Sequence, residues 1–177
     1  MTPGTQAYGV VTIDGSQYIE RPQIYTTQNT ITTPNEVQTN QRLTLPGVAN
    51  FLLKGMMRDI QAVNPPTDDQ PGSQDRRFRF RLLNAEGSTW FFGGGLGAYD
   101  DRVVDTLCFG NAQFPYPIIP PIPIAAAGTL IYEIEDMGLG AVTDPDYYPY
   151  FIQFGFLGTL LIPAALAGDT QSIVYAA

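Results

Sequence analysis

The segment at residues 114–136, which reads FPYPIIPPIPIAAAGTLIYEIED, constrains the fold more than any other part of the chain. Its first ten residues include five prolines, and each proline fixes φ and removes a backbone hydrogen-bond donor. This part must therefore be extended, at the edge of a sheet or as a connector. After Gly128 the residues alternate, with Leu130, Tyr132 and Ile134 on one face of an expected strand. A stiff connector followed by a two-faced strand is typical of double-sheet β proteins.

Further segments carry the same alternation. Residues 77–82 place apolar side chains inward and arginines outward, and residues 150–162 alternate in the same way. Residues 51–63 fit neither the helical nor the strand period cleanly, and we predict a strand with Gly55 at a bulge. The turn-forming residues at 64–75 predict a surface loop.

The middle of the chain predicts a hairpin and a helix. Residues 84–92 indicate a hairpin turn and the start of its return strand. The apolar spacing in residues 100–108 predicts one short helix, capped by Asp100 or Asp101. Several short strands with regular turns and at most one short helix predict an all-β fold, a β-sandwich.

Differences in amino-acid composition divide the sequence into three parts. Residues 1–42 are rich in threonine, glutamine and asparagine, and we expect an extended N-terminal arm that lies on a partner; a disordered tail is the alternative. Residues 43–163 form the expected sandwich, and residues 164–177 a C-terminal tail. The candidate contacts of the arm with neighbouring subunits are aromatic or apolar: Tyr8, Tyr18, Ile24 and Tyr25.

Composition argues against several functions. Charged residues make up 15% of the chain, below the ~25% of ordinary domains, which favours an assembly subunit covered by neighbours. The net charge of −8 argues against nucleic-acid binding, because phosphate contact needs a basic surface. Cys108 is the one cysteine, so no intrachain disulfide can form. The most apolar stretch, residues 151–167, is interrupted and too short for a membrane helix, and no signal-peptide pattern is present, so we expect a soluble chain.

The order of segments resembles a known group of proteins. The segments concerned are, in order, a Pro-Gly turn, FLLKG, FRFRL, WFF, the FPYPIIPPIPI connector and the TLIYEIED and FIQFGFLGTLLIP strands. Together they resemble the small jelly-roll structural proteins of tailed bacteriophages, which include capsid cement (decoration) proteins. The resemblance covers residues 43–163. It implies an eight-stranded jelly-roll β-sandwich, a homotrimer, and terminal arms that grip neighbouring subunits.

On this resemblance we expect a non-enzymatic viral structural protein. It would be made in the host cytoplasm and bind the major capsid protein on the capsid exterior of the virion, where it would stabilise the lattice without a cofactor. Two alternatives stay open: a carbohydrate- or receptor-binding module of a phage tail or spike, and a minor tail or neck component.

The residues themselves offer little for catalysis or metal binding. The chain has no histidine, which removes the commonest general base and metal ligand. Two functional alternatives are catalysis by paired carboxylates, with Glu133, Glu135 and Asp136 as candidates, and a Ca²⁺ site at Asp100, Asp101 and Asp105. We favour solvated acids and a helix cap. The glycines at residues 93–97 lack the Lys-Ser/Thr pair of a phosphate loop. Cys108 is expected in the core.

Two clusters remain as candidate binding sites. Arg77, Arg79 and Arg81 form a ladder on one strand face, about 7 Å apart. We favour pairing with Glu133 and Glu135, ahead of contact with a neighbouring subunit or an anionic ligand. Aromatic residues offer a glycan site as the alternative function, because exposed aromatic rings stack on sugars, although core or interface packing is the preferred interpretation: Trp90, Tyr147, Tyr148 and Tyr150.

Overall fold

The computed structural model describes residues 9–47, 49–62, 77–83, 102–110, 114–138 and 148–165. Strands predominate in these residues, and the one helix among them has four residues. The elements in chain order are β1 (Gly9–Ile13), β2 (Ser16–Ile31), β3 (Val37–Thr44), β4 (Asn50–Ala62), β5 (Phe78–Leu83), β6 (Val103–Val104), α1 (Asp105–Cys108), β7 (Tyr116–Ile124), β8 (Thr129–Asp136) and β9 (Tyr150–Pro163).

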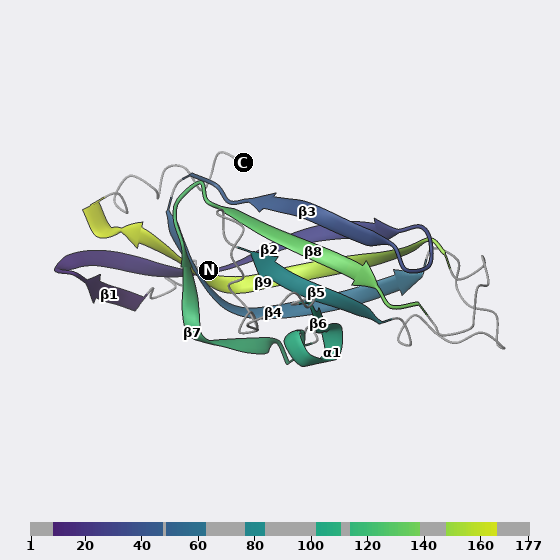
Figure 1. Cartoon of the computed structure of the whole chain (residues 1–177). Coiled ribbons are helices and arrows are strands. Elements are labelled where there is room, and N and C mark those ends of the chain that lie inside the picture. Colours follow the sequence, from purple (N-terminus) through teal and green to yellow (C-terminus); the bar gives the residue numbers. More distant parts are fainter. Residues whose placement is uncertain are drawn as a thin grey trace, which may run out of the picture.

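The strands pair as one long hairpin that is rolled up. β2 pairs with β9, β3 with β8, β4 with β7 and β5 with β6, each antiparallel. Two more pairings, β4 with β9 and β5 with β8, join these pairs into two sheets. We call them sheet A, with the order β1-β2-β9-β4-β7, and sheet B, with the order β3-β8-β5-β6. Figure 1 shows the two sheets facing each other. This connectivity is that of a jelly roll, which confirms the expected fold class.

Aromatic side chains from both sheets fill the core. Phe154 of β9 lies at its centre: its ring centroid is 5.3 Å from that of Phe80 and 5.6 Å from those of Phe78 and Tyr132. Phe109, which follows α1, packs 5.0 Å from Phe154 on another side. All five side chains are buried. The alternation predicted for β5, β8 and β9 is therefore what places these rings between the sheets.

The proline-rich segment forms β7 and lies at an edge of sheet A, as expected. Its only strand partner among the described residues is β4. The pairing shifts register between Leu53 and Gly55, where several β7 residues bulge past β4. A Cβ at Gly55 would lie 3.1 Å from the carbonyl oxygen of Tyr116, so a larger residue would crowd β7. The strand and the bulge predicted for residues 51–63 are both present.

The division at residue 42 is corrected by the structure. β2 and β3 belong to the two sheets, and β2 pairs with β9 over fourteen residues from Tyr18 to Ile31. These segments looked like an arm because they are polar. Their inward polar side chains are nevertheless satisfied: Tyr132 donates a hydrogen bond to Asn29 Oδ1 at 2.8 Å, and hydrogen-bonds Thr27 at 3.1 Å. β1, the first part of β2 and the end of β9 that pairs with it extend beyond sheet B, toward the left of Figure 1.

The observed helix is shorter than the one expected over residues 100–108. Val103 and Val104 form β6 and pair with Phe80 and Arg79, so α1 begins only at Asp105. The residue before the helix is Val104, and no side chain caps the first turn. Valines prefer strands, and pairing with β5 outcompetes one more helical turn. The described helix is far shorter than a bilayer-spanning helix.

Several sequence predictions concern residues outside the described ranges: the loop at 64–75, the hairpin at 84–92, the glycines at 93–97, the proposed cap residues Asp100 and Asp101, and most of the tail at 164–177.

Candidate functional site

The arginine ladder of β5 is paired within the chain. Arg81 lies directly opposite Glu133 of β8, and their side chains approach to 2.7 Å. Arg79 lies opposite Glu135, at 3.5 Å. Arg77 approaches Asp105 to 3.8 Å. The favoured interpretation, pairing with Glu133 and Glu135, therefore holds for Arg79 and Arg81, and a polyanion would have to compete with these carboxylates.

Arg102 completes this charged surface, which the sequence analysis did not foresee. Its guanidinium approaches Glu133 at 3.2 Å and Glu135 at 3.1 Å, so that it bridges the two acids. Glu133 is only 5% exposed, although we expected an outward, solvated side chain. The reason is that the long side chains of Arg81 and Arg102 cover it. We call Arg79, Arg81, Arg102, Glu133 and Glu135 the charged network of sheet B.

A second buried charge lies at the start of α1. Asp105 is fully buried and forms an ion pair with Arg58 of β4. Arg58 also lies over the ring of Phe78, at 5.8 Å from the centroid. Burial, and then the negative charge of Asp105, raise the pKa of the Cys108 thiol to about 12, although Arg58 opposes the shift. Cys108 is fully buried, as expected for a core residue.

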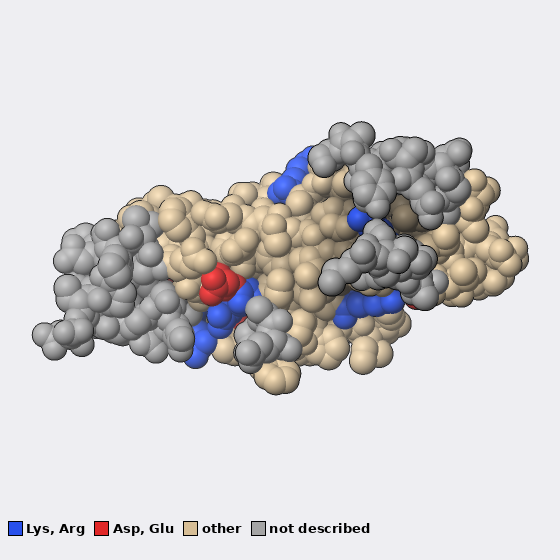
Figure 2. Space-filling view, turned by 180° about the vertical axis from the view of Figure 1, so that it is seen from behind, with Lys and Arg blue, Asp and Glu red and all other residues tan. Residues whose placement is uncertain are grey.

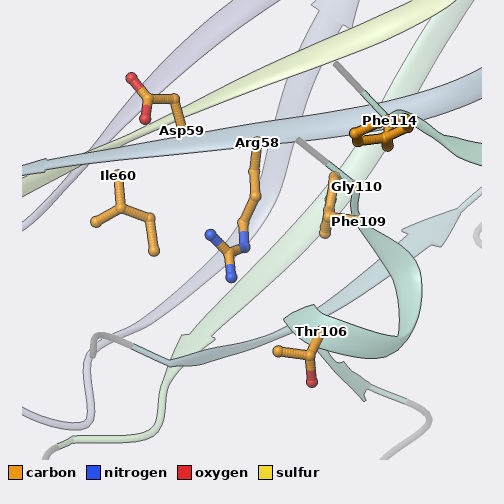
Figure 3. A pocket seen from close by; sticks show the side chains of 7 residues that line it. All are labelled: Arg58, Asp59, Ile60, Thr106, Phe109, Gly110 and Phe114. Carbon is orange, nitrogen blue, oxygen red and sulfur yellow. The ribbon is translucent and has the colours of Figure 1, made fainter. Parts of the chain in front are cut away.

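A pocket of about 520 Å³ opens next to this ion pair. Figure 3 shows that Arg58 reaches from β4 toward the side of Thr106, whereas Asp59 points away from it. The Phe114 side chain, 74% exposed, forms part of the wall. The charged group that reaches toward the pocket, the Arg58 guanidinium, is already paired with Asp105. Within the described residues, no group of three or more acidic or cysteine side chains is placed to hold a metal ion.

Tyr148 and Tyr150, two of the residues proposed for glycan binding, hydrogen-bond a buried carboxylate instead. Tyr150 and Tyr148 donate hydrogen bonds to the two carboxylate oxygens of Asp136, at 2.6 and 2.7 Å. The backbone N–H groups of Asn35 and Gly138 donate to the same carboxylate, at 3.0 and 3.1 Å. Tyr150 is fully buried and Tyr148 is 9% exposed, so neither ring can stack on a sugar.

Asp136 thus joins three parts of the chain: the turn after β2, the end of β8 and the start of β9. From the sequence, Asp136 is only one of three candidate carboxylates for catalysis. Nothing in its local pattern marks it as buried, because its donors lie up to 101 residues away. Trp90 and Tyr147, the other residues of the proposed glycan site, lie outside the described residues.

The candidate intersubunit residues that lie on β2 are divided between its two faces. Ile24 is 48% exposed, on the outer face of β2. Tyr25, its neighbour in sequence, points inward and packs edge-on against Phe51, with ring centroids 5.0 Å apart. Tyr18 is half-buried where β2 pairs with the end of β9. Tyr8 lies outside the described residues.

The outer face of sheet A differs chemically from that of sheet B. In antiparallel sheets, directly opposed residues share a face. Three adjacent rows on this face contain one charged residue, Asp59: Thr26, Gly155 and Met57; Gln28, Gln153 and Asp59; Thr30, Phe151 and Gln61. Figure 2, seen from behind Figure 1, shows charged side chains in a few small groups, one of which joins acidic and basic residues.

Comparisons with known proteins identify no family. No protein-family model matches the chain, and no curated protein matches it. Solved structures with some similarity include the VP2 subviral particle of infectious bursal disease virus, with 11% identity and a TM-score of 0.29 over 84% of this chain and 44% of that chain. A nora virus structure has 10% identity and a TM-score of 0.30 over 90% of this chain and 66% of that one. The chain therefore spans less than two thirds of either protein, and similarity this low supports no conclusion about function.

Proposed function

We propose that this protein is a non-enzymatic structural subunit of a virus particle, and that it binds the outer surface of the capsid as a cement protein. The observation that carries the proposal is the way in which the eight strands from β2 through β9 are connected and paired, which is that of a complete jelly roll. Jelly rolls of this kind form viral capsid proteins and lectins. The carbohydrate-binding alternative loses support because Tyr148 and Tyr150, two of its four candidate residues, are buried and hydrogen-bonded to Asp136.

The chemistry of the two outer faces supports an assembly role. The two carboxylates of the sheet B network, Glu133 and Glu135, are already paired within the chain, and Arg102 bridges them. The outer face of sheet A carries mainly threonine, glutamine and apolar side chains. A solitary domain ordinarily has more exposed charge than this. We assign the sheet A face to contact with the capsid shell, because an uncharged surface loses little hydration energy when a neighbouring protein covers it.

The copy number of the protein in purified virus particles tests this role. Quantitative mass spectrometry should find it in numbers comparable to the major shell protein. A few copies per particle would place it in the tail or neck, and its absence from particles would contradict the structural role altogether.

A binding assay tests the face. We expect the protein to co-sediment with capsids stripped of it, and a lysine at Gln153, exposed in the middle of the sheet A face, to weaken binding. Thr39→Lys provides the matched control, because Thr39 is an exposed polar residue of β3 in sheet B. Equal binding by both variants and the original protein would contradict the assignment of the face.

A further inference from the structure

Three of the four sheet edges in the described part of the chain are protected against pairing with another strand. β7 carries prolines, which cannot donate hydrogen bonds to a new strand. β6 has two residues. β3 has a register shift between Gln38 and Gln41, and Asn40 between them has a φ of 55°, so its edge is irregular. Such devices prevent unwanted association between sheets.

β1 is the edge without such a device. Its sequence, GVVTI, contains neither proline nor charge, and Val10 is 64% exposed. Regular antiparallel pairing with β2 runs from Gly9 to Ile13 without a shift. The tight turn that follows is well defined, because Asp14 and Gly15 both have positive φ, as a two-residue hairpin turn requires. In an antiparallel strand, alternate backbone N–H and C=O groups point away from the first partner. β1 therefore offers an ordered, unprotected row of hydrogen-bonding groups.

We propose that β1 pairs with β1 of a second copy of this chain, antiparallel and related by a two-fold axis at Val11. In this register Val11 faces its own equivalent, Val10 faces Thr12, and Gly9 faces Ile13. Each of these pairs is uncharged, and β-branched residues opposite one another stabilise sheets. The two Asp14 carboxylates would lie at opposite ends of the contact, about 20 Å apart at the usual strand rise, so they would hardly repel each other.

The arrangement also explains why assembly would stop at two copies. Pairing at β1 joins the two A sheets into one continuous sheet with β7 of each copy as its last strand on either side. The prolines of β7 then prevent further strands from being added at either end. A two-fold contact uses the same surface on both partners and is closed. The second copy is thus a better match than an unrelated strand, since it brings an edge of the same length, charge and twist.

This inference does not depend on the viral role, and the two can fail separately: the oligomeric state is measured on the purified protein without capsids. Sedimentation equilibrium of the full-length protein over a range of concentrations should show a monomer–dimer equilibrium. A protein that stays monomeric, or forms the trimer implied by the phage resemblance, would overturn the proposal.

A charge-swap experiment at the two-fold axis tests the contact itself. Val11→Lys places two lysines opposite each other and should weaken dimerisation roughly tenfold or more; Val11→Glu should do the same. An equimolar mixture of the two variants should dimerise again, because opposite charges then meet. Restored pairing is a result that a merely unfolded variant could not give. Val37→Lys is the control, since Val37 is an exposed apolar residue (47%) on the edge of sheet B. A dimer that tolerates both Val11 variants, or that Val37→Lys dissociates equally, would contradict the inference.

A cross-link tests the register without altering charge. Directly opposed residues in an antiparallel pair have Cα atoms about 4.5 to 5.5 Å apart, within the range of a disulfide. Val11→Cys should therefore form a covalent dimer on mild oxidation. The unaltered protein should not, because its own Cys108 is buried. Failure of Val11→Cys to cross-link at concentrations where the protein is dimeric would place the contact elsewhere.

Discussion

Glu133 of β8 and Arg81 of β5 face each other across sheet B, and their charged groups meet at 2.7 Å. Arg102, the residue before β6, approaches the same carboxylate at 3.2 Å. This carboxylate is therefore nearly buried between two guanidinium groups. The two arginines join β5, β8 and the segment before α1 on one face of the sandwich.

Replacing Glu133 by glutamine should destabilise the protein by about 1–3 kcal/mol, because two arginines then lose the charge that compensates their desolvation. The free energy of unfolding in urea measures the loss. Glu20→Gln is the matched control: the Glu20–Lys54 ion pair, at 3.6 Å, is exposed and should contribute less than about 1 kcal/mol. Equal losses in the two variants would mean that burial does not strengthen the Glu133 contacts.

Removing the hydroxyl of Tyr150 should cost about 1.5–3 kcal/mol, because a hydrogen bond to a buried carboxylate is lost and Asp136 keeps fewer donors. Tyr150→Phe changes no other atom, and urea unfolding again measures the effect. Tyr18→Phe, at a half-buried site on β2, should have a smaller effect. An unchanged stability of Tyr150→Phe would contradict the assigned role of Asp136 as a junction between loops.

Phe154→Ala should be the most destabilising of these substitutions, by about 3–5 kcal/mol, because it leaves a cavity among the rings of both sheets. Phe151→Ala on the same strand tests the assignment of faces. Its side chain lies on the outer face of sheet A and is only half-buried, so the loss should be less than half as large. If both substitutions cost the same, the assigned facing of β9 would be wrong.

Cys108 should resist thiol reagents as long as the protein is folded. Its pKa of about 12 leaves only on the order of one thiolate in ten thousand at pH 8, and the side chain is buried as well. The rate of labelling by a thiol-specific reagent should rise steeply across the urea unfolding transition. Fast labelling under native conditions would show that α1 opens readily.

Glu36 should make stability depend on acid pH. Burial alone would raise the pKa of its carboxyl, but hydrogen bonds from Gln38, Thr32 and Thr33 outweigh it, and the pKa is lowered. A lowered folded pKa stabilises the protein above the unfolded pKa of about 4.3, and this contribution is lost as the pH falls through the folded value. The stability difference between the original protein and Glu36→Gln should therefore be larger at pH 7 than at pH 3. A difference that is independent of pH would contradict this assignment.

One part of the fold was missed although its signal is local. The dipeptide Asp14-Gly15 between apolar residues is a strong hairpin signal, and it forms the turn between β1 and β2. We instead expected an arm over residues 1–42, because threonine and glutamine dominate there. β2 does alternate, but two of its inward residues, Thr27 and Asn29, are polar. Hydrophobic periodicity cannot reveal a strand whose inward positions are satisfied by a hydrogen bond from Tyr132.

Properties that depend on neighbouring residues could be predicted without the structure. Prolines without N–H groups confined β7 to an edge, alternation set the inward faces of β5, β8 and β9, and Gly55 marked the bulge of β4. The pairing of the strands and the burial of polar groups, in contrast, became visible only in the folded chain. Arg102 and Glu133 are 31 residues apart, and Asn35 and Asp136 are 101 apart. Whether such a carboxylate is solvated or buried depends on hydrogen-bond donors that folding brings from distant segments. The residues next to the carboxylate in the sequence do not show which donors these will be.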